Sequence, residues 1–287
     1  MSIETGELQR RARAIRNVTE PIAAGVYFAP EAHQGYEAQG LDYFEGYFCS
    51  RSACLGAAPW SVVCAAFAAF KPAAVESSVT KGWAKTTPAP MLAAREAGAT
   101  AQLERLVGPV ADPADVARAT EILFTGSDGV DPSGRALFAG LSILDRPTTT
   151  YGALWRAADL VREHRGDGHI AAWMPHVDST EITVMTELAW GIPPRSYVFT
   201  RGWDEGEVDA AYARLTERGL VADGTLTDRG TALREHIERT TDESTSAVVD
   251  RIGDDYDELI ALLTPMAEAI VTGGGYPTSP KNLSVSG

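Results

Sequence analysis

Long apolar runs and basic charge are both scarce in this 287-residue sequence. No segment is apolar for long enough to span a bilayer, and the opening residues, MSIETGELQRRARAIRN, lack the apolar stretch of a signal peptide. The sequence therefore predicts no membrane contact and a cytoplasmic location. Lys and Arg number 25 against 39 Asp and Glu, and this net charge of -14 repels nucleic acid unless a local basic patch overrides it.

Cysteine pairs are also missing, because the chain has three cysteines, Cys49, Cys54 and Cys64, within one apolar segment. This odd number predicts buried free thiols rather than a disulfide framework. Haem or metal ligation by these thiols is a weaker alternative. The sequence has no phosphate-binding loop, dinucleotide fingerprint or nucleophile elbow, so we expect no cofactor.

Apolar residues recur at helical spacing, as at Leu259, Leu263, Met266 and Ile270, whereas strict alternation is rare. The pattern predicts a mainly α fold. Proline is favoured in the first turn of a helix, and six prolines stand at or near predicted helix starts. These are Pro59, Pro72, Pro88, Pro113, Pro132 and Pro147.

The clearest boundary signal lies between Leu123 and Tyr151, where a Gly/Asp/Ser loop, a short apolar run and a Thr cluster follow one another. We expect a multi-helix N-terminal lobe at residues 1–147 and a winged-helix-like lobe at 148–272. Residues 273–287 have the composition of a flexible tail.

The segment from Trp203 to Thr240 has the order of a winged helix. A helix with one apolar face is followed by RGLVADGTLTDRG and a second helix. Asp223 and Gly224 tolerate positive φ, which predicts a two-residue hairpin turn that forms the wing. Thr227 or the next residue would cap the following helix. This order resembles the C-terminal half of the winged helices in MarR-type regulators.

A winged helix usually reads DNA, but the charges of this one oppose that role. The helix before the wing enters the major groove in the usual geometry. Between Asp204 and Gly224 the sequence has six acids against two bases, Arg214 and Arg218. The preceding helix, predicted at Ser179–Trp190, is also followed by a longer connection than a helix-turn-helix has. We therefore expect no DNA binding.

A polar cluster precedes the winged-helix segment, in REHRGDGH and the residues that follow it. His169 and Asp167 are two positions apart and can meet across a turn, where a carboxylate-oriented histidine exchanges protons near neutral pH. The structural alternative is a helix end at Gly166, with Asp167 as the N-cap of a new helix. The histidine spacing fits no established zinc motif, so we expect no metal.

The N-terminal third is rich in aromatic residues, and GYFCSRSACLG places a cation, Arg51, among them. Small residues beside large rings pack closely or leave a pocket with apolar walls. An arginine in such a setting pairs with an acid or contacts an anionic ligand, and the ion pair is the favoured interpretation.

Several motifs together resemble an actinobacterial family whose members are labelled helix-turn-helix proteins and have no assigned activity. They are GYFCSRSACLG, LWRAADLVREHRGDGHIAA, RGW and RGLVADGTLTDRG, of which REHRGDGH is the most specific. The resemblance covers most of the chain and implies a helix-turn-helix fold. Cys49 and Cys54 stand where the family has Ala and Pro or a similar residue, and Ala68 and Ala69 stand where it has a polar Tyr-Asn pair. Together these departures remove bulk and polarity from an expected cavity wall.

These observations predict a small-molecule-binding protein on a degenerate winged-helix scaffold, with cofactor-independent acid/base chemistry on a specialised metabolite. His169 would be the general acid or base, oriented by Asp167, and Arg51 or Arg162 would bind an anion. Tyr47, Ser50 and Trp173 complete the predicted ligand contacts. A ligand-responsive MarR-like regulator and a non-catalytic metabolite-sequestering protein remain alternatives, and the prediction leaves a homodimer open.

Overall fold

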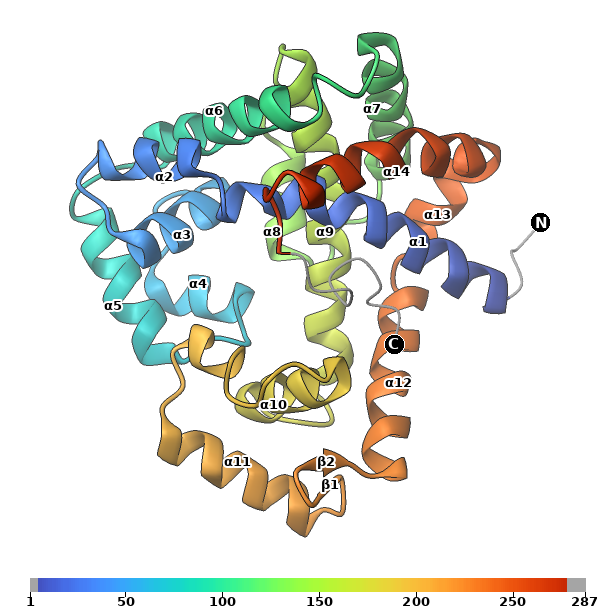
Figure 1. The fold of residues 1–287 in the computed structure, drawn as a ribbon. Helices are drawn as coiled ribbons and strands as arrows, with labels where there is room; N and C mark the ends of the chain where they lie inside the picture. Colours follow the sequence, from blue (N-terminus) through green and yellow to red (C-terminus); the bar gives the residue numbers. More distant parts are fainter. Residues whose placement is uncertain (1–4, 278–287) are drawn as a thin grey trace.

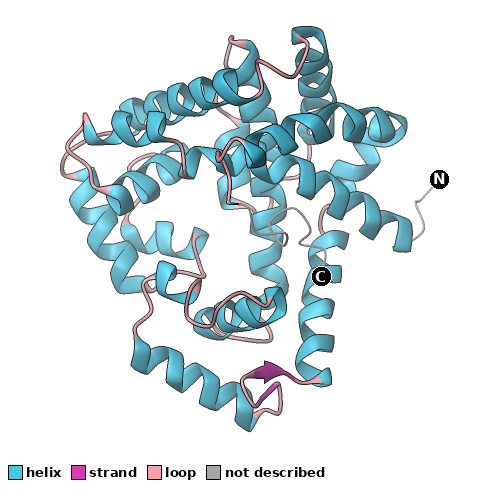
Figure 2. Cartoon of the chain, viewed as in Figure 1, coloured by secondary structure: helices cyan, strands magenta, loops and turns pink. Residues whose placement is uncertain are grey.

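A computed structural model describes residues 5–277, and Figures 1 and 2 show that nearly all its regular structure is helical. The predicted mainly α fold is confirmed. Within residues 5–277, eight α-helices precede the long central one: α1 (Thr5–Ala24), α2 (Pro30–Glu37), α3 (Tyr43–Ser52), α4 (Trp60–Ala66), α5 (Pro72–Trp83), α6 (Pro88–Leu106), α7 (Pro113–Ser127) and α8 (Ala136–Ser142). Among the described residues, no helix has both the length and the apolar character needed to cross a membrane.

Proline and polar caps set several helix starts as the sequence predicts. Pro72, Pro88 and Pro113 are the first residues of α5, α6 and α7, where a missing N–H costs no helical hydrogen bond. Pro59 occupies the N-cap position of α4. Short 3₁₀ segments connect some of these helices, at Gly25–Tyr27 and Ala53–Leu55 among others.

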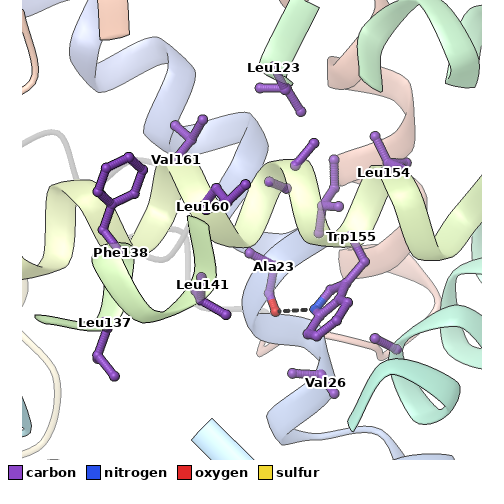
Figure 3. Packing of buried hydrophobic residues seen from close by; sticks show 14 of the residues in the cluster. Ala23, Val26, Leu123, Leu137, Phe138, Leu141, Leu154, Trp155, Leu160 and Val161 are labelled. Carbon is purple, nitrogen blue, oxygen red and sulfur yellow. Dashed lines mark hydrogen bonds between the residues drawn. The ribbon is translucent and has the colours of Figure 1, made fainter. Parts of the chain in front are cut away.

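The central helix α9 (Thr150–Trp173) packs against α1, α6, α7, α8 and α12. Leu154, Trp155, Ala157 and Ala158 are buried almost completely on it. Figure 3 shows the Trp155 indole N–H donating to the Ala23 carbonyl oxygen of α1 at 3.2 Å. This bond satisfies the one polar atom of a large buried ring, and it fixes α1 against α9.

Two apolar cores occupy the molecule, and they do not divide at the predicted boundary of residue 147. The first core takes buried residues from positions 12–161 and again from 248–270, so the N-terminal half of α9 belongs to it. α13 (Ser246–Ile252) and α14 (Tyr256–Thr272) return to this core, and α14 lies beside α1 (Figure 1). The loop before α9 is therefore a turn inside one packed unit.

The second core, from residues 172–237, is the winged-helix-like part. It comprises α10 (Ser179–Trp190), α11 (Glu205–Glu217), strands β1 (Val221–Ala222) and β2 (Thr225–Leu226), and α12 (Asp228–Glu243). α10 has the bounds that the sequence predicts. Asp223 and Gly224 have φ of 49° and 74°, the positive values that the predicted hairpin turn requires. Thr227 caps α12 by accepting the Gly230 N–H at 3.1 Å.

The described part of the predicted tail packs on the body of the protein. Gln102 donates to the Gly275 carbonyl oxygen at 3.3 Å. The Tyr276 ring meets the Phe28 ring edge-on, with centroids 5.7 Å apart. Residues 278–287 of the predicted tail lie outside the described residues. The segment up to Tyr276 thus belongs to the folded unit.

Candidate ligand-binding cavity

A cavity of about 240 Å³ lies where the two cores meet. Helices α1, α9, α10, α12 and α13 contribute to its wall. The charged lining residues are Arg16, Glu20, Arg51, Arg162, Arg165, Arg234 and Glu238, and the aromatic ones are Trp190, Tyr197 and Tyr276. Ala12, Ile15, Val161, Val248 and Val249 add aliphatic surface. Apolar walls with a few convergent charged groups are typical of small-molecule sites.

The central helix presents one face of the predicted polar cluster to this cavity. Arg162, Arg165, Gly166 and His169 line it, at the spacing of three or four residues that shares a helix face. The predicted helix end at Gly166 is wrong, because α9 continues without a break to Trp173. Packing on several neighbouring helices overrides the weak helix preference of the two glycines in REHRGDGH.

Asp167 points to a different partner from the one that the sequence predicts. Its carboxylate accepts the Phe138 backbone N–H at 3.0 Å, in the first turn of α8. Burial raises the pKa of Asp167 to about 6, against the lowering effect of this hydrogen bond. Asp167 therefore caps a helix, as the structural alternative proposed, but the helix is α8. The predicted orientation of His169 by Asp167 is absent.

His169 instead contacts α12. Its Nδ1 lies 3.0 Å from Thr241 Oγ1, and the Thr241 hydroxyl donates its proton to the Ile237 carbonyl oxygen at 2.8 Å. His169 Nδ1–H is therefore the donor to Thr241, and its Nε2 keeps a lone pair. Burial lowers the pKa of His169 to about 3, so the ring is neutral at physiological pH.

One end of the cavity, the Glu163 end, has a balanced set of charges. Arg51 forms a bidentate pair with Glu163, through Nε at 2.9 Å and Nη2 at 2.7 Å. Arg162 donates to Glu163 at 2.8 Å and to Glu20 at 2.9 Å. Burial opposes ionisation of Glu163, but Arg51 and Arg162 lower its pKa to about 2. The favoured ion-pair interpretation of Arg51 is confirmed, and both predicted arginines line the cavity.

At the other end, the Glu238 end, three guanidinium groups share one carboxylate. Arg16, Arg165 and Arg234 lie 3.5, 3.1 and 2.5 Å from the Glu238 oxygens. Arg165 also lies 2.9 Å from Asp242. No sequence motif predicts Arg16, Arg234 or Glu238 as site residues. The spacing of four between Arg234 and Glu238 is a weak signal, because exposed helices carry it equally often.

Three predicted ligand contacts lie outside the cavity wall. Tyr47 accepts a hydrogen bond from Arg51 Nη1 at 3.1 Å, and Ser50 is buried and donates to the Tyr47 carbonyl oxygen. Trp173 packs in the second core. Tyr47 therefore supports Arg51, whereas Trp173 is a core residue.

The cysteines are free thiols, as predicted. Burial raises the pKa values of Cys49 and Cys54 to about 12, and Cys64 is half-buried. Within the described part of the chain, no group of three or more His, Cys, Asp or Glu side chains could hold a metal ion.

A family model described as a helix-turn-helix family matches residues 12–277. The chain belongs to this helix-turn-helix family. The match confirms the resemblance to a helix-turn-helix family that the sequence motifs indicate. No curated protein and no solved structure matches the chain.

The helix-turn-helix part of this family member has an acidic outer surface. The two bases between Asp204 and Gly224 are held in ion pairs within the protein. Arg214 lies 2.6 Å from Asp178 and 3.1 Å from Glu181, and Arg218 lies 2.9 Å from Glu181. Lys71, just before α5, pairs in turn with Asp204 and Glu207 at the start of α11. Few positive charges on this helix-turn-helix surface therefore remain for phosphate groups.

Proposed function

We propose that this protein binds a small molecule in the cavity between its two cores, on a helix-turn-helix scaffold that does not read DNA. The observation that carries the proposal is the lining of the cavity, to which three aromatic residues and five arginines contribute. Charged groups this far inside a protein cost desolvation energy, which a bound ligand offsets.

The geometry supports binding more than acid/base catalysis. A general acid near neutral pH needs a proton to give, and His169 is neutral because burial lowers its pKa to about 3. Asp167, its predicted partner, is held by the N-terminus of α8. His169 Nε2 can still accept a hydrogen bond from a ligand, which suits recognition.

The experiment that tests this function fills the cavity. Gly166 lines it, and an added Cβ would meet only the Glu163 carboxylate at 3.5 Å, which is ordinary contact. Gly166→Leu therefore places a side chain in the cavity on a continuous helix. We expect a metabolite screen by thermal denaturation to find compounds that raise the wild-type Tm by about 5 °C at saturating concentration.

The same compounds should leave the Tm of Gly166→Leu unchanged. Gly166→Ala, which adds one methyl group, is the matched control and should keep most of the shift. Equal shifts for wild type and Gly166→Leu would place binding elsewhere and contradict the proposal. A screen in which nothing shifts the wild type would contradict it as well.

A further inference from the structure

We propose that the ligand is an organic monoanion, a carboxylate whose charged group lies between Arg165 and Arg234 and whose apolar body extends toward Trp190 and Tyr197. This inference rests on the proposed function, and it adds the chemical class and the orientation of the ligand. Four observations support it: the charge balance of the Glu238 end, its unpartnered donors, the contrast with the Glu163 end, and the aromatic wall.

The Glu238 end has one positive charge more than its acids neutralise. The arginines that line it are Arg16, Arg165 and Arg234, and the acids that pair with them are Glu238 and Asp242. Burial, together with repulsion by Arg165, lowers the pKa of Arg16 to about 10. A surplus of one charge favours a monoanionic carboxylate over a phosphate, which carries nearly two charges at neutral pH.

Two nitrogen atoms at this end have no hydrogen-bond acceptor. They are Arg165 Nη1 and Arg234 Nε, on side chains that are more than nine-tenths buried. A buried guanidinium N–H without a partner is costly. Because both residues line the cavity, their guanidinium groups can donate to an anion placed in it.

The Glu163 end offers no comparable place for an anion. There Arg51 and Arg162 face the two carboxylates of Glu163 and Glu20, and the charges cancel. Both oxygens of Glu163 already accept from these arginines. An additional anion at this end would meet two carboxylates at close range. The contrast orients the ligand with its charge toward α12.

The apolar body of the ligand has an aromatic wall to contact. The Trp190 and Tyr197 rings pack against each other with centroids 5.4 Å apart, and both line the cavity. Val161, Val248 and Val249 complete the apolar surface. Aromatic walls of this kind favour an aryl or alkyl group over a sugar.

Isothermal titration calorimetry of the full chain tests the assignment. The probes are phenylacetate, 3-phenylpropionate and 4-phenylbutyrate, each compared with its primary amide, which has nearly the same shape and no charge. We expect at least one carboxylate to bind about tenfold or more tightly than its amide, as charge-assisted hydrogen bonds to two buried donors require.

Arg234→Gln should remove most of the preference for the carboxylate over its amide. The affinity for the amide should stay within about threefold of the wild-type value. The variant should fold, because Glu238 keeps Arg16 and Arg165 as partners. Arg13→Gln is the matched control: Arg13 belongs to the same cluster but does not line the cavity, so the preference should stay within about threefold of wild type.

A second readout needs no variant. The carboxyl group of ¹³C-labelled 4-phenylbutyrate, followed by NMR in the complex, should titrate about one pH unit or more below the free acid, since a tenfold preference for the anion equals one unit.

Equal affinity for acid and amide, with both lost in Gly166→Leu, would overturn the anion assignment and leave the proposed function standing. An unshifted carboxyl titration would overturn the assignment as well. If neither kind of probe binds the wild type, the anion assignment fails, and the metabolite screen with Gly166→Leu decides the proposed function separately.

Discussion

At the scale of single residues, burial decides the charge state of the histidines on α9. His164 is buried almost completely against the Phe138 ring, and its Nδ1 has no hydrogen-bond partner. Burial, and to a lesser extent the nearby Arg135, lowers the pKa of His164 to about 4. The two histidines of REHRGDGH, His164 and His169, therefore contribute ring surface and lone pairs rather than charge.

The buried His164 should make stability depend on pH. Between pH 6.5 and about pH 4 the unfolded chain binds a proton at this residue that the folded chain does not, so the free energy of unfolding falls as the pH falls. Over this window, the free energy of unfolding of His164→Phe should fall by about 1–3 kcal/mol less than that of the wild type. Urea denaturation at several pH values measures the difference. Parallel pH profiles for the two proteins would show that His164 does not cause the loss.

At the scale of secondary-structure elements, the two glycines of REHRGDGH have different surroundings on the same helix. Gly166 faces the cavity and has free space beside it. Gly168 faces α12, where an added Cβ would overlap Ser244 Oγ and lie 2.7 Å from Arg135 Nη1. Gly168 thus permits the close approach of α9 and α12 that closes one side of the cavity.

This difference predicts opposite effects of the same substitution. Gly166→Ala should raise the free energy of unfolding by about 0.5–1 kcal/mol, because alanine reduces the entropy of the unfolded chain and favours the helix. Gly168→Ala should lower it by about 1 kcal/mol or more through overpacking. Denaturant titrations of the two variants measure both effects, and a shift of the same sign in both would refute the assignment of the two faces.

Elements with local signals could be predicted from the sequence. α10 has a capping box in which Asp178 accepts the Glu181 N–H and Glu181 accepts the Asp178 N–H, and the hairpin has its Asp-Gly turn. The continuity of α9 could not be predicted, because packing on distant helices stabilises its glycines. The Glu238 end was missed for the same reason: its arginines come from α1, α9 and α12, which are far apart in the sequence.

At the scale of the whole molecule, a negative net charge coexists with a cavity that is rich in arginine. The chain has a net charge of -14, yet five of its arginines line one internal cavity. The negative surface repels polyanions. At physiological ionic strength, salt screens this repulsion beyond about 8 Å, so a small monoanion can approach the protein. Arginine is thus concentrated where a small anion can reach it and a DNA backbone cannot.

This charge distribution predicts that the protein does not bind duplex DNA tightly. The outward acids of α11 and the paired Arg214 and Arg218 leave little attraction for phosphates. In a fluorescence anisotropy titration at physiological salt, we expect any dissociation constant to be weaker than about 10⁻⁶ M. Sub-micromolar, salt-sensitive affinity for a promoter fragment would favour the MarR-like regulator instead.

The most direct test of a ligand-binding cavity is a crystal structure of the protein grown with the arylalkyl carboxylate that binds best. We expect electron density inside the cavity, with the carboxylate within about 3 Å of the Arg165 and Arg234 guanidinium groups and the aryl ring near Trp190 and Tyr197. Density at Arg51 and Arg162, or outside the cavity with its interior unchanged, would contradict it.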